Sequence, residues 1–279
     1  MNKNVSVVIP TIGEQSLMTT INLLNDGLLI PHEILIVIPN IFISNLNNIT
    51  MPSNVTILDV NLASQVQQRI HGFIHAHNDY VLQLDSDILL EKDALYNLFN
   101  MLIDKGPNSC VAPIYKTDLN VKLNKIKSYL FKYFINRERK FNNWDTWYEF
   151  YIPKNSNFSQ VKWLPGGCIL HYKKNLITKN YYLLKGKAYD EDLLHSFLLT
   201  KNNINLYICS NAKAESVDFI HYNHKNFLSF IKFIYKISRV KFSLLIMSRG
   251  NKLFFAIWYS QWIINEIIRY IKNLFRSYK

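Results

Sequence analysis

The segment LQLDSDILLEKDAL, residues 82–95, sets the fold expected for this chain. An apolar strand predicted over Asp79–Leu84 runs directly into Asp85-Ser86-Asp87. Beyond this turn, apolar residues recur at i, i+3, i+4 and i+7 from Leu95, which is the spacing of one buried helix face. A strand, an acidic turn and an amphipathic helix in this order are typical of an α/β sheet whose strand ends carry a ligand site.

Three further strands are predicted on the N-terminal side of this segment. The β-branched runs lie at Asn4–Pro10, Glu33–Ile38 and Val55–Val60, with helices expected around Ser16–Leu24 and Ala63–Ala76. Strands that alternate with helices favour a doubly wound mixed sheet with helices on both faces. Ligands of such sheets bind beyond the carboxyl ends of the strands.

The second half of the chain is predicted to be less regular. Residues 116–160 are rich in Asn, Lys and aromatic residues and are interpreted as an excursion over the site that contacts an acceptor. A strand, a Pro-Gly-Gly turn and a second strand are expected over Val161–Tyr172, a helix over Lys187–Leu199, and a short strand at Asn205–Cys209.

The net charge of +12 is concentrated near the C-terminus. Residues 225–279 hold eleven Lys and Arg residues against one acid, Glu266, so this segment accounts for +10 of the total. Its apolar residues recur at helical spacing opposite the basic ones, a pattern typical of helices that lie on an anionic membrane surface. We therefore expect a catalytic domain over residues 1–224 and a basic, amphipathic, membrane-associating tail over residues 225–279.

Two other features indicate the compartment. The three cysteines are scattered and include no CxxC pair, which favours a reducing environment over a disulfide framework. The first residues run straight into a predicted strand, without the apolar core and cleavage site of a secretory signal. The expected location is the cytoplasm, peripheral on the inner face of a bacterial cell membrane.

The acidic turn predicts a metal site. Asp85 and Asp87 are one residue apart at a strand end and emerge on the same side of the chain. Two such carboxylates repel unless a cation lies beside them. Mg²⁺ and Mn²⁺ prefer oxygen ligands and bridge carboxylates to the phosphates of a substrate. A solvated surface turn is the alternative explanation for this pair.

A second acidic cluster, Asp190-Glu191-Asp192, opens a predicted helix. A carboxylate at a helix N-terminus is electrostatically favoured and can accept a proton from an attacking hydroxyl. The same acids could instead only cap the helix. Which of the three would act as the base is left open by the sequence.

These motifs together resemble the family 2 glycosyltransferases of the GT-A fold. The similar segments occur in the family's order: VSVVIPTIGE (5–14), QRIHGFIHAHNDYVLQLDSDI (68–88), WLPGGCIL (163–170) and AYDEDLLHSFLL (188–199). The resemblance implies transfer of a sugar from a nucleotide-diphosphate donor with inversion at the anomeric carbon, usually with Mg²⁺ or Mn²⁺.

The resemblance also implies roles for individual residues. Those that would meet the donor are Pro10, Thr11, Glu14, Arg69, Asp85, Ser86, Gly166 and Gly167. Gln65 and Gln68 accompany Arg69 on the same predicted helix as weaker candidates. Asp87, with Asp85, would hold the metal, and His221 or else His224 would complete its shell. The family's Glu-Asp motif falls on Glu191 and Asp192, with the aspartate as base.

One segment departs from the family pattern. The place after the second strand where the family commonly has an acidic pair reads LIVIPNIF, residues 35–42, so recognition of the donor base is left open, with UDP as the favoured nucleotide. The expected acceptor is a glycan or a lipid-linked glycan of cell-surface polysaccharide synthesis, and no nucleic acid partner is expected.

Two other functions are considered: a nucleotidyltransferase, and a non-enzymatic basic protein that binds membranes or nucleic acid. TIGEQSL lacks the Gly-rich, Lys-containing phosphate loop of the first, and the second leaves both acidic motifs without a role.

Overall fold

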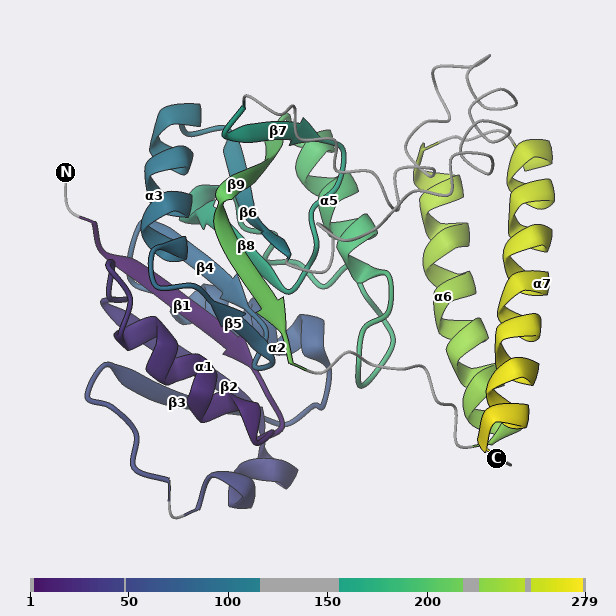
Figure 1. Ribbon diagram of the computed structural model, residues 1–279, viewed down its shortest axis with the longest axis horizontal. Coiled ribbons are helices and arrows are strands. Elements are labelled where there is room, and N and C mark those ends of the chain that lie inside the picture. The colour runs from purple at the N-terminus through teal and green to yellow at the C-terminus, as the bar shows by residue number, and fades with distance from the viewer. Residues whose placement is uncertain (1–2, 48, 116–155, 218–225, 249–251, 278–279) are drawn as a thin grey trace. The chain divides into compact units, whose positions relative to one another are not determined.

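The computed structural model describes residues 3–47, 49–115, 156–217, 226–248 and 252–277 (Figure 1). These residues fall into two compact units, a sheet with its helices up to residue 217 and a pair of helices from residue 226. The expected domain boundary between residues 224 and 225, and residues 116–155 of the expected irregular segment, lie outside the described residues.

The first unit is built on one nine-stranded mixed sheet. Its strands are β1 (Val5–Pro10), β2 (Glu33–Pro39), β3 (Val55–Val60), β4 (Tyr80–Leu84), β5 (Ile88–Leu90), β6 (Ser109–Tyr115), β7 (Phe158–Val161), β8 (Cys168–Tyr172) and β9 (Asn205–Ser216). The order is β3-β2-β1-β4-β8-β6-β9-β5, and β7 pairs with β9. The predicted doubly wound α/β sheet is confirmed.

The four strands from β3 to β4 are parallel and carry the predicted apolar runs. Strands β1, β2 and β4 are almost entirely buried, because helices cover both faces of the sheet, whereas the edge strand β3 is more exposed. Parallel pairing puts the carboxyl ends of β1 and β4 at the same edge. Strand β8 runs antiparallel to β4, with Leu84 opposite Cys168, so the turn that precedes β8 lies at that edge too.

Helices cover the two faces in pairs. The helices of the first unit are α1 (Ser16–Asn25), α2 (Gln65–His75), α3 (Ala94–Lys105) and α5 (Glu191–Lys201), with 3₁₀ turns η1 (Asn40–Leu46) and η3 (Lys173–Asn175). Side chains of α1 and α3 pack in one cluster with Val7 and Val111 of the sheet. On the other face, α2 packs on Val8 and α5 on Ala112. Neighbouring residues of a strand thus pack on opposite faces of the sheet, because successive side chains of a strand point in opposite directions.

The structure differs from the sequence prediction in four elements. Strands β5 and β6 were not predicted, because β5 has only three residues and β6 contains Pro113, where its pairing with β9 shifts register. Strand β9 extends to Ser216 rather than Cys209, since β5 supplies a partner for its polar second half. Helix α5 begins at Glu191, four residues later than expected, because Asp190 has a left-handed backbone with φ 55°.

The second unit consists of α6 (Phe227–Ser248) and α7 (Lys252–Ser277). The helices pack antiparallel. Phe230 near the start of α6 stacks on Tyr270 near the end of α7, and Phe242 in the second half of α6 contacts Phe255 near the start of α7. Over the residues that the structure describes, none of the helices has the length and apolar character required to span a membrane.

Candidate active site

The first loop and the acidic turn meet at the edge where β1 and β4 end. Pro10 is the last, buried residue of β1, and Thr11 and Glu14 follow it. The Glu14 carboxylate accepts hydrogen bonds from the Thr11 hydroxyl and, at 3.0 Å, from the Ser86 hydroxyl. Glu14 therefore ties the loop after β1 to the acidic turn after β4. Its oxygen Oε2 serves this clamp, whereas the resemblance assigned Glu14 to the donor.

The Gly166-Gly167 turn lies beside the same edge. The Asp85 amide donates to the Gly167 carbonyl at 2.8 Å, and the Gln83 side chain donates to the Gly166 carbonyl. A Cβ on Gly166 would lie 2.7 Å from Oε1 of Glu191, which is closer than real Cβ contacts. A larger residue would displace the Glu191 carboxylate and crowd Asp192, whose Cβ would lie 3.2 Å from the added atom, so the first turn of α5 packs closely against this backbone.

Arg69, on α2, joins the two acidic motifs. Its side chain is 2% exposed and pairs with Asp85 at 2.7 Å and with Glu191 through its other terminal nitrogen. Burial alone would lower the pKa of Arg69, but the charges of Asp85 and Glu191 raise it well above the usual value. The guanidinium is therefore charged, and it offsets the repulsion between two carboxylates that the fold brings together.

Two glutamines of α2 hold the surrounding backbone. Gln65 donates to Asp85 at 3.3 Å and accepts the Ala188 amide at 3.1 Å. Gln68 is buried and donates to the carbonyl oxygens of Thr11 and Val37, at 2.9 and 2.7 Å. Each glutamine thus links loops that are far apart in sequence, so the two weaker candidates contribute hydrogen bonds to the cluster.

The acids of α5 differ in environment. Glu191 is buried and held by Arg69, whereas Asp192 is half-buried and accepts the Leu193 amide at 3.0 Å. Burial and then the charges of Glu191 and Asp190 raise the pKa of Asp192 to about 8, against the opposing effects of the Leu193 amide and Arg69. A carboxylate that titrates near neutral pH is suited to general base catalysis.

Tyr181 is a member of the cluster that the sequence did not reveal. Its hydroxyl donates to Oε2 of Glu191 at 3.2 Å, and its ring stacks on His195 with 5.6 Å between the ring centroids. His195 is fully buried, which lowers its pKa to about 3, with a further contribution from Arg69. A neutral histidine therefore supports the tyrosine that positions Glu191. No local pattern marks Tyr181, because the sequence around it contains neither a motif nor a periodic element.

The predicted metal ligands are only partly brought together. Asp85 accepts hydrogen bonds from Arg69 and Gln65 on its two oxygens, and Asp87 lies two residues further along the same turn. His221 and His224 lie outside the described residues. Among the residues that are described, no group of three or more His, Cys, Asp and Glu side chains is placed to hold a metal ion.

Comparisons with known proteins identify a similar family and a shared fold. The family model for glycosyl transferase family 2 matches residues 51–161, which include α2, β4 and the acidic turn but fewer than half of the chain. A search of curated proteins found no match. The resemblance to family 2 that the sequence motifs indicated is confirmed by the match over these residues.

Solved structures share the fold. GalNAc-T7, solved with UDP, GalNAc and Mn²⁺, is 13% identical with a TM-score of 0.54 and aligns over 80% of this chain and 44% of its own. Staphylococcus aureus TarS 1–349, solved with UDP-GlcNAc, is 14% identical with a TM-score of 0.52 and aligns over 87% of this chain and 66% of its own. The chain therefore spans under half of the first and about two thirds of the second, and it has the GT-A glycosyltransferase fold.

Proposed function

We propose that the protein is a metal-dependent, inverting glycosyltransferase that moves a sugar from a nucleotide-diphosphate donor to a hydroxyl of a glycan or lipid-linked glycan. The observation that carries this proposal is the buried Arg69, which joins the acidic turn after β4 to the acidic start of α5. A donor bound at the first motif would thus lie next to the proposed base in the second. The UDP in the two similar structures makes a UDP-sugar the first donor to test.

Each acidic motif has a separate task in this mechanism. Asp192 accepts the proton of the acceptor hydroxyl as its oxygen attacks the anomeric carbon. Arg69 and Tyr181 fix the neighbouring Glu191 and so orient the first turn of α5. Asp87 would hold Mg²⁺ or Mn²⁺, which often uses one or two carboxylates together with substrate phosphates. The ion would stabilise the negative charge on the departing diphosphate. The Mn²⁺ in the GalNAc-T7 structure supports this cofactor.

The proposed reaction is tested by nucleotide release. The purified chain is incubated with a panel of UDP-, GDP-, dTDP- and CDP-sugars, with and without Mn²⁺, and the released nucleoside diphosphate is measured. We expect release from at least one donor, dependent on the metal and lost in Asp192→Asn. Absence of release from every donor, together with tight binding to DNA or RNA, would favour the non-enzymatic alternative.

We also propose that the helical pair α6–α7 holds the enzyme on an anionic membrane surface. On α7, large apolar side chains are exposed at Ile264, Ile267, Ile268, Ile271 and Leu274, a spacing that places them along one side of the helix. This stripe is distinct from the face that carries Tyr259 and Tyr270, which contacts α6. The helix therefore presents apolar side chains on two sides, of which only one is used within the pair.

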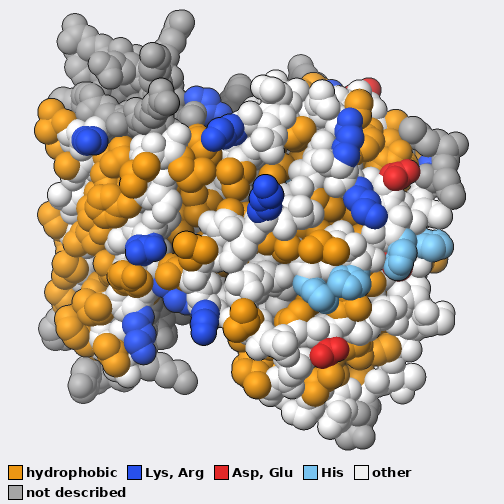
Figure 2. All heavy atoms as spheres, turned by 180° about the vertical axis from the view of Figure 1, so that it is seen from behind, with side chains coloured by type: hydrophobic (Ala, Val, Ile, Leu, Met, Phe, Trp, Pro, Cys, Tyr) orange, Lys and Arg blue, Asp and Glu red, His pale blue; other side chains and the backbone are white. Residues whose placement is uncertain are grey.

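Helix α6 also has an exposed apolar stripe, which includes Ile231, Tyr235 and Ile246. Exposed basic residues border both stripes: Lys232 and Arg239 on α6, and Arg269 and Lys272 on α7. Figure 2 shows hydrophobic side chains gathered over the helical pair with Lys and Arg side chains among them. Apolar stripes flanked by cations match the chemistry of a bilayer surface that contains anionic lipid.

Two equally exposed isoleucines provide a matched test of this surface. Ile246 on α6 is 75% exposed, and Ile41 in η1 of the first unit is 73% exposed. We expect the wild type to co-sediment with vesicles that contain phosphatidylglycerol, and less so with neutral vesicles or at high salt. Ile246→Asp should weaken this binding, while Ile41→Asp, with the same charge change, should not. Equal effects of the two substitutions would contradict the membrane proposal.

A further inference from the structure

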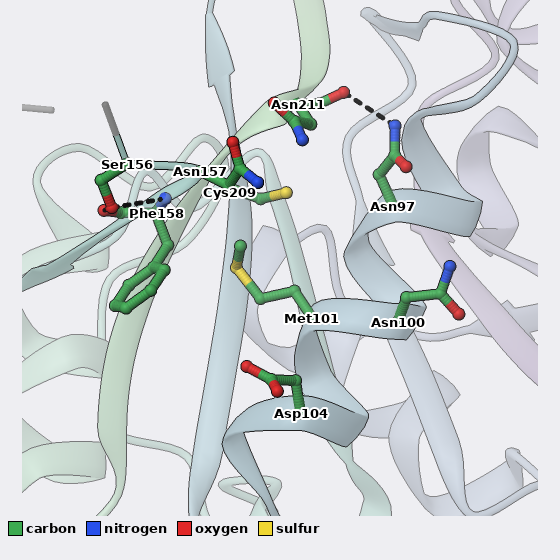
Figure 3. A pocket seen from close by; sticks show the side chains of 9 residues that line it. All are labelled: Asn97, Asn100, Met101, Asp104, Ser156, Asn157, Phe158, Cys209 and Asn211. Carbon is green, nitrogen blue, oxygen red and sulfur yellow. Dashed lines mark hydrogen bonds between the residues drawn. The ribbon is translucent and has the colours of Figure 1, made fainter. Parts of the chain in front are cut away.

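A cavity of about 450 Å³ opens on the face of the sheet that α3 covers (Figure 3). Its walls come from α3, from the start of β7 and from the middle of β9. Arg69 and Glu191 belong to α2 and α5, the helices on the opposite face, so this cavity is distinct from the candidate active site. Its volume lies within the range of small-molecule sites in proteins.

The polar lining consists mainly of side-chain amides. Asn100 of α3 and Asn157, next to β7, have side chains without a hydrogen-bond partner in the described part of the chain, and Asp104 adds a carboxylate. An amide offers both donors and acceptors, and a carboxylate accepts from neighbouring hydroxyls. This set matches a ligand that carries several hydroxyl groups.

The inner wall of the cavity is apolar. Met101 extends from α3 toward Cys209 of β9, which is 2% exposed, and Phe158 lies beside them (Figure 3). The Lys105 ammonium lies 3.4 Å from the centroid of the Phe158 ring and helps to fix its orientation. A few polar groups around an apolar wall are typical of sites that orient a small ligand, and the C–H face of a sugar ring suits such a wall.

The charge of the lining argues against an anionic ligand. None of the described residues that line the cavity is Lys, Arg or His. The adjacent Lys105 is paired with Asp104 at 3.0 Å. The described lining therefore offers a phosphate or nucleotide no unpaired cation, and the Asp104–Lys105 pair has no net positive charge to attract it. A neutral polyhydroxylated ligand fits these side chains better.

We propose that this cavity binds a neutral saccharide unit of the acceptor glycan, apart from the site of transfer. The proposal rests on the proposed glycosyltransferase function, because that function supplies a glycan as the second substrate. A second point of attachment raises the effective concentration of the acceptor near the active site. The cavity therefore favours long acceptors over short ones without taking part in the chemical step.

A glycan array tests binding directly. The full-length protein is labelled and applied to an array of neutral and anionic oligosaccharides, and positive ligands are titrated by ligand-observed NMR. We expect neutral oligosaccharides to bind, and the double variant Asn100→Ala/Asn157→Ala to weaken this binding at least tenfold. Asn108→Ala, which removes an exposed amide outside the cavity, serves as the control and should bind as the wild type does. Binding of anionic glycans alone, or neutral binding that the double variant retains, would overturn the proposal.

Turnover measurements distinguish a failure of the saccharide-site proposal from a failure of the proposed transferase function. With an active donor, the double variant should raise KM for a long acceptor while leaving kcat and the KM of a monosaccharide acceptor unchanged. Nucleotide release without any glycan binding on the array would refute the saccharide site but not the proposed transferase function. Glycan binding that the double variant weakens, without nucleotide release from any donor, would refute the transferase function but not the saccharide site.

Discussion

The rate of transfer should depend on pH through the ionisation of Asp192. Its pKa of about 8 results from burial and from the charges of Glu191 and Asp190. Only the ionised carboxylate accepts a proton, so the active fraction increases as pH rises. At this pKa, roughly one tenth of the free enzyme is in the active form at pH 7 and about nine tenths at pH 9. We therefore expect kcat/KM to rise about tenfold over this interval.

The assay is nucleotide release at subsaturating acceptor across pH 5–10, with donor binding measured separately by calorimetry. Asp192→Asn keeps the size of the side chain but cannot accept a proton. It should lower the rate by roughly 10²–10⁴ and remove the rise toward pH 9, while donor affinity is retained. The fold of each variant is checked by its urea denaturation midpoint.

Two results would refute this reasoning. A wild-type profile that is already flat above pH 5 would mean that no group with a raised pKa limits the reaction. A normal rate in Asp192→Asn, with the large loss found instead in Asp190→Asn or Glu191→Gln, would show that another acid of this motif is the base.

Three further substitutions test the rest of the cluster. Asp87→Ala should abolish metal-dependent donor binding in calorimetry with Mn²⁺ and leave the fold intact, and unchanged affinity would remove Asp87 from the metal site. Arg69→Met leaves Asp85 and Glu191 without their shared cation and should lower the free energy of unfolding in urea by about 3–5 kcal/mol, whereas an unchanged midpoint would contradict its structural role. Gly166→Ala places a Cβ 2.7 Å from Oε1 of Glu191 and should lower kcat more than it alters donor affinity.

Much of the fold could be predicted because its signals are local. The β-branched runs of β1 and β2 identify buried parallel strands, and the predicted bounds agree with the structure to within one residue at each end. The short β5 and the proline-containing β6 have no comparable pattern, because their pairing with β9 supplies what their own sequence lacks. Strand order likewise depends on pairings between distant segments.

The candidate site likewise contains residues that local sequence patterns reveal and residues that only tertiary contacts reveal. The Asp85-Ser86-Asp87 turn and the Asp190-Glu191-Asp192 cluster could be identified from the sequence, since a carboxylate pair after a strand and acids at a helix start are short patterns. Tyr181 could not, because its importance comes from one hydrogen bond to Glu191 and from stacking on His195. The role of Glu14 as a clamp to Ser86 was also hidden, since these residues are 72 positions apart.

The sequence by itself determined the class of fold, the two acidic motifs and the basic amphipathic character of the C-terminal helices, because periodicity and charge act over a few residues. Only the tertiary structure decided that these motifs form one cluster. Arg69 and Glu191 are 122 residues apart, and they meet because α2 and α5 pack on the same face of the sheet. At that meeting point the charges of Asp85 and Glu191 keep the buried Arg69 ionised, and burial raises the pKa of Asp192. Desolvation is a property of the folded surroundings, so no local pattern in the chain could specify it.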